Sequence, residues 1–216
     1  TGDAVSRLYA KGCASFSGVS DVMGSVKRLE VGSCLNAHEL LQISGVLSAA
    51  KAHKTHYEET QDSLTPLYDS LDPVPSLYAQ IKKCIISEDE ISDDASANLK
   101  DIRRNIRLAN DRIHTELNKI LNNQALRNCL QDYVITSRQG RYCLPVKAEY
   151  KSQVPGMVHD QSATGSTIFI EPAAVVKLNN DIRELELKEE AEIQVILADL
   201  SAQAAEYTEQ IATDYK

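Results

Sequence analysis

The sequence lacks the features that mark membrane-spanning and secreted proteins. No apolar run approaches the roughly 18 residues that a membrane-spanning helix needs, so we expect no segment that crosses a bilayer. The chain begins Thr1-Gly2-Asp3, without the basic start and apolar stretch of a signal peptide. An initiator methionine is also absent. We therefore expect an excised piece of a larger cytoplasmic protein.

Motifs for nucleotide binding and metal binding are missing too. Neither a GxxxxGK(S/T) phosphate loop nor a GxGxxG turn occurs, so no nucleotide site is visible in this chain. The acidic stretch 85–95 lacks the glycine and terminal glutamate of a calcium loop, and its carboxylates suit a helix N-terminus instead. His53 and His56 have helical spacing but no third ligand nearby, which favours solvated histidines. We expect no cofactor or metal in this segment.

The cysteines show no pairing pattern. They are scattered and odd in number, and no two form a CxxC pair: Cys13, Cys34, Cys84, Cys129 and Cys143. Such spacing is typical of reduced thiols in a cytoplasmic protein rather than of a disulfide framework or a zinc site.

Negative charge exceeds positive charge overall, but basic residues are enriched in two stretches. The net charge of −8 argues against indiscriminate nucleic-acid binding. Residues 100–119 nevertheless carry six basic and three acidic side chains, and residues 138–151 carry four basic side chains against Glu149 alone. Residues 172–216 reverse the balance, with four basic and ten acidic side chains. The positive part of this negative chain is therefore the segment 138–151 with the helix before it.

Apolar residues at helical spacing predict two long helices. The first spans about 96–123 and carries a narrow apolar seam: Leu99, Ile102, Ile106, Ala109, Ile113, Leu117 and Ile120. The second spans about 172–215 and begins at Pro172, where the missing N–H costs nothing. Its seam is interrupted at Glu189: Val175, Leu178, Ile182, Leu185, Ile193, Ile196, Leu200, Tyr207 and Ile211. Seams this narrow need a partner, and the simplest partner of each helix is the other.

Residues 133–172 are the one part of the chain with β-type patterning. We expect strands at 133–137, 141–147, 157–161 and 166–171, with a tight turn at Arg138-Gln139-Gly140. Pro145 has no backbone N–H to donate to a neighbouring strand, so we expect it at an edge of the sheet or at a bulge. The predicted fold class is mainly α, with a helical core bundle and two long antiparallel helices that bear this small antiparallel sheet at their tip.

The N-terminal part predicts a small helical bundle. Residues 1–20 are rich in Gly, Ser and Ala without a clear period, so we expect a partly disordered loop. Helices are expected at 21–30, 37–57 and 76–84, and the isoleucine-bearing ends of 85–91 suit a small hairpin. Asn36 and Glu39 have the spacing of a capping box.

The best functional candidates are basic side chains interleaved with tyrosines around the predicted sheet. These are Arg138, Arg141, Lys147 and Lys151 with Tyr133, Tyr142 and Tyr150. Basic and aromatic groups on exposed loops suit phosphate backbones and unstacked bases, whereas a solvated charged face is the alternative. Arg103, Arg104 and Arg107 on the preceding helix either extend this track or pair with acidic residues of the second long helix.

A hydrolytic site would need His159, Asp160 and Ser162 to converge. Adjacent residues of a strand point to opposite faces, so their closeness in sequence does not bring them together. A polar strand end that enters a turn is the simpler interpretation.

Several runs resemble the bacterial MutS paralogue that does not perform mismatch repair, the MutS two branch. They are Gly140-Arg141-Tyr142, Pro145-Val146-Lys147, Val158 to Ser162, Phe169-Ile170-Glu171-Pro172 and Leu178-Asn179-Asn180. Residues 16–128 resemble the same family more loosely. Cys143 stands where the family commonly has an aliphatic residue.

The resemblance implies a core fragment at 1–93, a first lever helix at 94–130, a β clamp at 131–171 and a second lever helix at 172–216. It implies that the parent forms a homodimer around DNA and carries an ATPase domain, with ATP and Mg, and an endonuclease domain. Those domains lie outside these residues, so we expect no catalytic residue in this segment.

Two functions follow as hypotheses. In the first, the segment binds branched or junction DNA or the ribosomal RNA of a stalled ribosome, and the parent suppresses recombination or rescues ribosomes. In the second, the segment is a coiled-coil dimerisation and interaction module without direct nucleic-acid contact. Steep salt dependence of binding distinguishes the first from the second.

Overall fold

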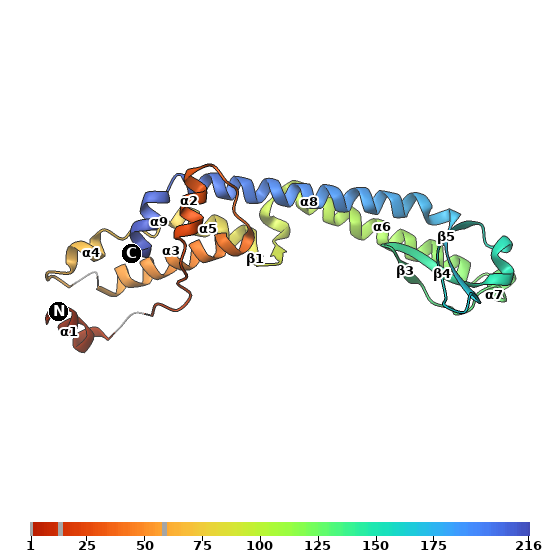
Figure 1. Ribbon diagram of the computed structural model, residues 1–216, viewed down its shortest axis with the longest axis horizontal. Coiled ribbons are helices and arrows are strands. Elements are labelled where there is room, and N and C mark those ends of the chain that lie inside the picture. Colours follow the sequence, from red (N-terminus) through yellow and green to blue (C-terminus); the bar gives the residue numbers. More distant parts are fainter. Residues whose placement is uncertain (1, 13–14, 58–59) are drawn as a thin grey trace. The chain divides into compact units, whose positions relative to one another are not determined.

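The computed structural model describes residues 2–12, 15–57 and 60–216. The described chain is mainly α-helical and divides into two compact units (Figure 1). Unit 1 comprises residues 1–100 with 191–216, and unit 2 comprises residues 101–190. Two long helices, α6 (Ala97–Leu121) and α8 (Val176–Ala205), contribute residues to both units. Among the described helices, none combines the length and the apolarity that a bilayer span requires.

Unit 1 is a helical bundle with one small hairpin. Besides its parts of α6 and α8, its helices are α1 (Gly2–Lys11), α2 (Met23–Glu30), α3 (Ala37–Tyr57), α4 (Thr65–Asp69), α5 (Pro75–Cys84) and α9 (Thr208–Tyr215). The hairpin pairs β1 (Ile85–Ser87) with β2 (Glu90–Ile91), and a 3-10 turn at Asp93–Ala95 leads into α6. The helices predicted within 21–84 and the hairpin are confirmed.

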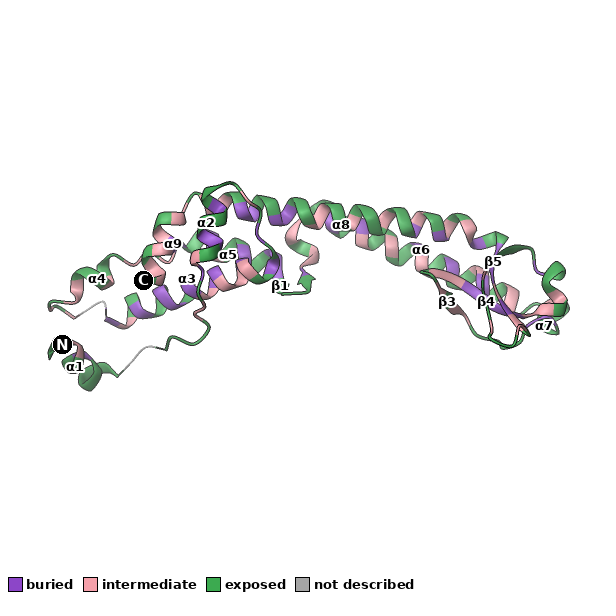
Figure 2. Ribbon diagram, in the orientation of Figure 1, coloured by how far each residue is buried: buried purple, intermediate pink, exposed green. Residues whose placement is uncertain are grey.

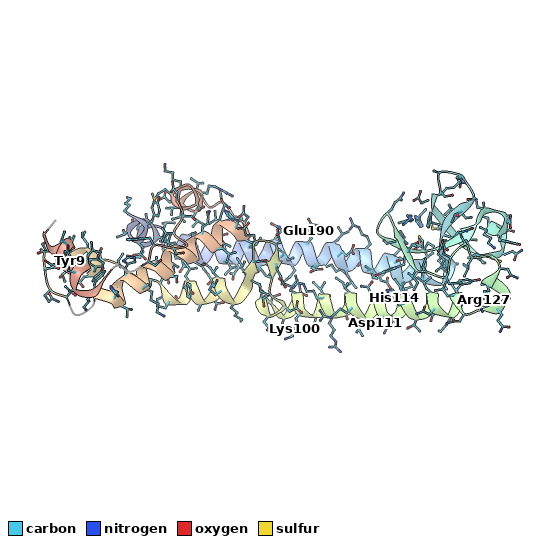
Figure 3. The ribbon with its side chains drawn as sticks, turned by 90° about the horizontal axis from the view of Figure 1, so that it is seen from below. Tyr9, Lys100, Asp111, His114, Arg127 and Glu190 are labelled. Carbon is cyan, nitrogen blue, oxygen red and sulfur yellow. The ribbon has the colours of Figure 1, made fainter. Side chains whose placement is uncertain are left out.

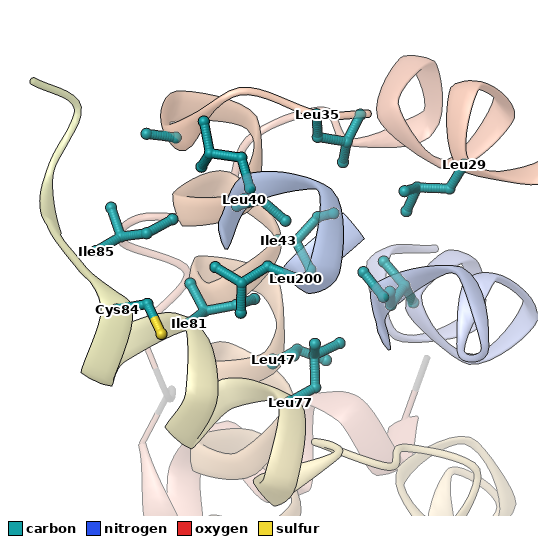
Figure 4. Close-up of a cluster of buried hydrophobic side chains, with 14 of the residues drawn as sticks. Leu29, Leu35, Leu40, Ile43, Leu47, Leu77, Ile81, Cys84, Ile85 and Leu200 are labelled. Carbon is teal, nitrogen blue, oxygen red and sulfur yellow. The ribbon is translucent and has the colours of Figure 1, made fainter. Parts of the chain in front are cut away.

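The core of unit 1 forms where α3, α5 and α8 bring their apolar sides together. Leu40, Ile43 and Leu47 recur at helical spacing on α3 and are fully buried. Figure 4 shows Ile81 of α5 and Leu200 of α8 in the same cluster. Because each such side chain contributes about 1.5–3 kcal/mol when it leaves water, this cluster holds the bundle together.

The N-terminus of α3 carries the predicted capping box. Asn36 Oδ1 accepts a hydrogen bond from Glu39 N at 2.9 Å, and Glu39 Oε2 accepts one from Asn36 N at 3.0 Å. Two N–H groups that the helix leaves unpaired are thereby satisfied, and the prediction is confirmed.

The expectation of a loop over residues 1–20 is wrong for its first half. α1 occupies Gly2–Lys11, and its Arg7 is only 3% exposed. The guanidinium of Arg7 donates to Asp62 through Nε at 2.7 Å and Nη2 at 2.5 Å, and it lies 4.5 Å from the ring centroid of Tyr68. A partner 55 residues away holds this helix, which local composition does not reveal. Cys13, predicted to be a reduced thiol, lies outside the described residues.

The second long helix is not continuous to residue 215. α8 ends at Ala205, and Tyr207, with φ −120° and ψ 20°, precedes the shorter helix α9. The break lets Ile211 of α9 reach the core of unit 1, where it is fully buried. No proline or glycine marks this position, so the apolar periodicity alone predicts one helix.

Unit 2 contains a four-stranded antiparallel sheet. Its strands are β3 (Thr136–Arg138), β4 (Arg141–Lys147), β5 (Gly156–Gln161) and β6 (Thr167–Pro172), in the order β3-β4-β6-β5. The turn between β3 and β4 has positive φ at Gln139 (51°) and Gly140 (73°), as a two-residue primed hairpin requires. Three of the predicted strands are confirmed to within one residue, whereas the strand predicted at 133–137 begins only at Thr136 and includes Arg138, which was predicted to lie in the turn. The short helix α7 (Gln124–Arg127) and 3-10 turns at Ala148–Gln153 and Ala173–Val175 complete the unit.

Pro145 lies in regular register and not at a bulge. It pairs with Phe169 of β6. On the other side of β4, Pro145 O accepts a hydrogen bond from Gln131 N at 2.9 Å, beside the isolated bridge between Leu130 and Val146. The expectation of an edge or a bulge is therefore wrong, because β4 is an inner strand; the proline is tolerated because only an isolated bridge flanks it on the side away from β6.

The sheet and the helices of unit 2 share one apolar core. Ile113 and Leu117 of α6 are fully buried in a cluster with Leu144 and Val146 of β4 and Ile170 of β6. Figure 2 shows the buried positions of α6 recurring along the helix. The expectation that each long helix is the other's partner is incomplete here, because the sheet also covers the seam.

Within unit 2, α6 and α8 run antiparallel beside each other. Arg103 Nε of α6 donates to Glu189 Oε1 of α8 at 2.7 Å. Further along, Arg112 of α6 and Asp181 of α8 line one groove of ≈ 350 Å³. Residue numbers therefore increase along α6 in the direction in which they decrease along α8, so the two helices are antiparallel.

Candidate nucleic-acid interface

A buried carboxylate organises the sheet. Glu171, at the end of β6, has no exposed side-chain surface. Arg141 donates to it twice, from Nε to Oε2 at 2.9 Å and from Nη2 to Oε1 at 2.6 Å. Asn179 Nδ2 of α8 also donates to Glu171 Oε1, at 2.8 Å. Arg141 Nη2 further donates to Asn180 Oδ1 at 2.8 Å, so β4, β6 and α8 meet at this carboxylate.

His159 completes the cluster because β5 is irregular at this residue. The pairing of β5 with β6 shifts between Val158 and Asp160, and a bulge turns the side chain of the extra residue. His159 Nε2 lies 2.5 Å from Glu171 Oε2. The sequence predicted a polar strand end here, and the structure adds a specific partner.

The surroundings of Glu171 keep it ionised. Burial alone would raise the pKa of Glu171, but the hydrogen bonds from Arg141, His159 and Asn179 outweigh burial and lower it. The neighbouring thiol behaves oppositely. Burial, together with the negative charge of Glu171, raises the pKa of Cys143 to about 11. Cys143 is therefore a protonated, unreactive thiol.

Arg138 is partly exposed, and besides a hydrogen bond from Nη1 to Ser137 O at 2.8 Å it contacts two side chains. Its guanidinium lies 3.8 Å from the ring centroid of Phe169, and its Nε lies 3.1 Å from Asp160 Oδ2. The aromatic face and the carboxylate fix its orientation, and the carboxylate offsets its charge.

Lys147 is half-buried and Lys151 is exposed, and both belong to unit 2. Lys147 Nζ donates to Asn128 O at 3.0 Å and lies 6.0 Å from the ring centroid of Tyr150. Lys151 follows Tyr150 in the 3-10 turn and is exposed. Neither ammonium group has a carboxylate partner among the described residues, so neither charge is balanced there.

Sequence reasoning missed one basic residue in this part of unit 2. Arg127 ends α7, and its guanidinium lies 5.2 Å from the ring centroid of Tyr133 (Figure 3 labels Arg127). It is next to Asn128, whose carbonyl oxygen accepts from Lys147. The pattern of a basic residue six positions before a tyrosine gives no signal that the two side chains meet. We name Arg127, Tyr133, Lys147, Tyr150 and Lys151 the basic patch.

Tyr142 does not join the basic patch. Its hydroxyl donates to Asn110 Oδ1 of α6 at 2.7 Å, and its ring packs edge-on against His114 with centroids 5.2 Å apart. Its N–H donates to Asn179 Oδ1 of α8 at 3.1 Å. Tyr142 therefore fastens β4 to both helices.

The three helix arginines differ in their surroundings. Arg103 pairs with Glu189, as one of the two sequence interpretations expects. Arg104 and Arg107 are exposed on α6, and Arg107 has an interaction partner of its own. Arg103 therefore joins α6 to α8 through its ion pair with Glu189.

The residues of the conceivable hydrolytic site do not converge. His159 contacts Glu171, whereas Asp160 contacts Arg138. Ser162 Oγ accepts a hydrogen bond from Thr167 N at 3.0 Å inside the turn. Among the described residues, no group of three His, Cys, Asp or Glu side chains is placed to hold a metal ion.

Comparison with known proteins identifies relatives across the whole chain. No family model matches it. A protein of Lachnospira eligens named Endonuclease MutS2 is 66% identical over 216 residues, which is 100% of this chain and 27% of that relative. Proteins of the same name from Agathobacter rectalis and Alkaliphilus oremlandii are 52% and 41% identical, each over 28% of its length.

The chain is thus much shorter than these relatives. It spans about a quarter of their length, and the match runs over 99–100% of its own residues in the three cases named. The resemblance seen in the sheet and in the start of the second long helix extends over the whole chain. This chain therefore belongs to the MutS2 family, as a segment of its much longer members.

Proposed function

We propose that this segment is the lever and clamp part of a MutS2-type protein, and that its basic patch contacts the phosphate backbone of branched DNA or structured ribosomal RNA. The two long helices with the sheet between them are the levers and the clamp. The parent would dimerise and suppress recombination or rescue stalled ribosomes.

One observation carries this proposal. Lys147 and Lys151 have no carboxylate partners among the described residues, and Lys147 binds the carbonyl oxygen of Asn128, the residue that follows Arg127. Two tyrosine rings accompany these cations, at 5.2 Å from Arg127 and 6.0 Å from Lys147. Cations position a phosphate backbone and aromatic rings receive unstacked bases, so the combination suits nucleic acid that is not a regular duplex.

For this proposed role, the sheet must keep a fixed orientation on the long helices of unit 2. Arg141, one of the sequence candidates, donates to Glu171 at 2.6 Å and 2.9 Å and to Asn180 at 2.8 Å, which engages its Nε and Nη2 groups within the fold. We assign it a positioning role, together with Tyr142. Arg138 and Arg104 remain proposed secondary contacts.

We propose that ATP and Mg, which the family resemblance implies for the parent, are bound outside the residues of this chain. No phosphate-binding loop occurs in the sequence, and the described residues include no cluster of metal ligands. Nucleotide hydrolysis and strand cleavage are therefore proposed for the rest of the parent only.

The direct test is fluorescence anisotropy over a salt series, with labelled duplex DNA, four-way-junction DNA and structured RNA. The variant Arg127→Gln, Lys147→Gln, Lys151→Gln removes the cations of the basic patch. Since each neutralised phosphate contributes about 0.9 to the slope of log K against log salt, the slope should fall by up to about 2.7 on B-DNA. Lys51→Gln, Lys82→Gln, Lys83→Gln removes three exposed cations of unit 1 and is the matched control.

A second function rests on exposed apolar residues of the long helices. Leu108 of α6 and Leu187 of α8, both in unit 2, are 44% and 52% exposed. An interaction module would cover them against a second copy. Sedimentation velocity of the wild type and of Leu108→Gln, Leu187→Gln tests this, because a dimer built on these residues would dissociate in the variant.

A further inference from the structure

Unit 1 contains a cavity that the proposed nucleic-acid function does not use. Its volume is ≈ 520 Å³, which lies in the range of roughly 300–1,000 Å³ typical of small-molecule sites. Its walls are mostly apolar and come from α3, α4 and α9. Val46, Ala49 and Ala50 of α3 face Leu67 of α4 and Tyr215 of α9.

Two polar side chains in this cavity have buried atoms without a hydrogen-bond partner. His53 of α3 is 7% exposed, and its Nε2 is unpaired. Asp214 of α9 uses Oδ1 to accept from Asp72 N at 3.0 Å and from Gln210 Nε2 at 2.8 Å, whereas its Oδ2 is buried and unpaired. Buried polar atoms are rarely left unpaired, so two of them in one apolar cavity point to a ligand that completes them.

Both unpaired atoms are suited to accept hydrogen bonds. Burial lowers the pKa of His53, against an opposing hydrogen bond to the Ser15 backbone. The ring is therefore neutral, and the nitrogen not engaged with Ser15 is an acceptor. Asp214 accepts hydrogen bonds through Oδ1 only, so Oδ2 has acceptor capacity left, although burial raises the pKa of this carboxyl group.

The cavity also has aromatic side chains against which the ring of a ligand can pack. The ring of Phe16 lies 4.3 Å from the ring of His53, tilted by 36°, and both residues line the cavity. Aliphatic and aromatic walls favour a flat apolar molecule, because burial of its surface is the main gain on binding.

We propose that this cavity binds a small aromatic amine or amidine, whose N–H groups donate to His53 Nε2 and Asp214 Oδ2 while its ring packs on the apolar walls. A cationic amidine gains further from the carboxylate of Asp214. The site is independent of the basic patch, since all its residues belong to unit 1.

The test is a titration of the isotope-labelled chain followed by 1H–15N NMR. Benzamidine is the probe, and methyl benzoate, of similar size but without N–H or O–H donors, is the matched compound. Saturable shifts at the amides of Ala50, Asp214 and Tyr215 with benzamidine, at least tenfold weaker with methyl benzoate, are expected. Absence of saturable shifts with benzamidine, or equal affinity for both compounds, would overturn the proposal.

Variants locate the site. Asp214→Asn and His53→Phe each remove one acceptor at nearly constant size and should weaken benzamidine about tenfold, the effect of one lost charge-assisted or buried hydrogen bond. Asp69→Asn makes the same charge change at an exposed residue outside the cavity and should not alter affinity.

A rim variant keeps the test valid if a buried variant fails to fold. Leu67 lines the cavity and is 65% exposed, so Leu67→Trp narrows the entrance without disturbing the core. Loss of benzamidine binding in this variant, at an unchanged melting temperature, supports the proposal. Unchanged affinity in both Leu67→Trp and Asp214→Asn contradicts it.

Discussion

Arg141 and Glu171 form a two-bond ion pair at the base of the sheet, with Nε–Oε2 and Nη2–Oε1 distances of 2.9 Å and 2.6 Å. The residues lie 30 positions apart in sequence, on β4 and β6. The carboxylate is inaccessible, whereas the arginine side chain keeps 20% of its surface exposed. The pair therefore fixes how the strands meet the start of α8.

Removal of one partner should destabilise unit 2. Glu171→Gln leaves Arg141 without its counter-charge, and breaking a buried ion pair costs about 3–5 kcal/mol. Urea unfolding monitored by circular dichroism measures the loss. Glu186→Gln breaks only an exposed pair with Arg183 and should cost less than about 1 kcal/mol. Equal losses of unfolding free energy in the two variants would show that the buried pair stabilises the fold no more than the exposed pair does.

The same carboxylate predicts a pH dependence. Because the folded state lowers the pKa of Glu171, its contribution to stability is present above the unfolded pKa, near 4.5, and is lost as the pH falls through the folded pKa. Urea unfolding at a series of pH values below 6 should show this loss in the wild type. In Glu171→Gln the slope of stability against pH over that range should be smaller, and an identical slope would contradict the assignment.

Cysteine reactivity provides a test of burial. Cys34 is exposed, whereas Cys143 is fully buried with a pKa raised to about 11. In a Cys13→Ser background, a thiol reagent such as DTNB should modify Cys34 within minutes and Cys143 only on unfolding. Mass mapping of the modified peptides distinguishes the two, and rapid labelling of Cys143 in the folded chain would contradict its burial.

The capping box of α3 should be worth about 1 kcal/mol. Asn36→Ala removes the oxygen that accepts from Glu39 N, so one N–H at the helix start loses its partner. Thermal unfolding should show a lower melting temperature than the wild type. Asn118→Ala changes the same residue type at an exposed position inside α6 and is expected to be neutral or slightly stabilising, because alanine has the higher helix propensity.

Periodicity predicted the regular elements well. The buried positions of α6 follow from steps of three and four, and Gly140 marked the turn between β3 and β4. These are local signals, since the repeat of a helix and the φ of a turn depend on neighbouring residues. The same signals failed at Tyr207, where the helix breaks so that Ile211 can pack into a distant core.

The candidate site was only partly predictable for the same reason. Arg141 and Arg138 were chosen by charge, yet their partners Glu171 and Asp160 lie on other strands, 30 and 22 residues away. Local sequence does not say which arginine meets a buried carboxylate. The Glu171 cluster also depends on the bulge at His159, a shift of register that alternation alone does not show.

The central claim is that the basic patch binds nucleic acid, and the salt dependence of junction-DNA and structured-RNA binding tests it most directly. The account predicts steep, salt-sensitive binding by the wild type and by the unit 1 control. The variant Arg127→Gln, Lys147→Gln, Lys151→Gln should bind more weakly, with a shallower slope. An unchanged affinity and slope in that variant would contradict the claim.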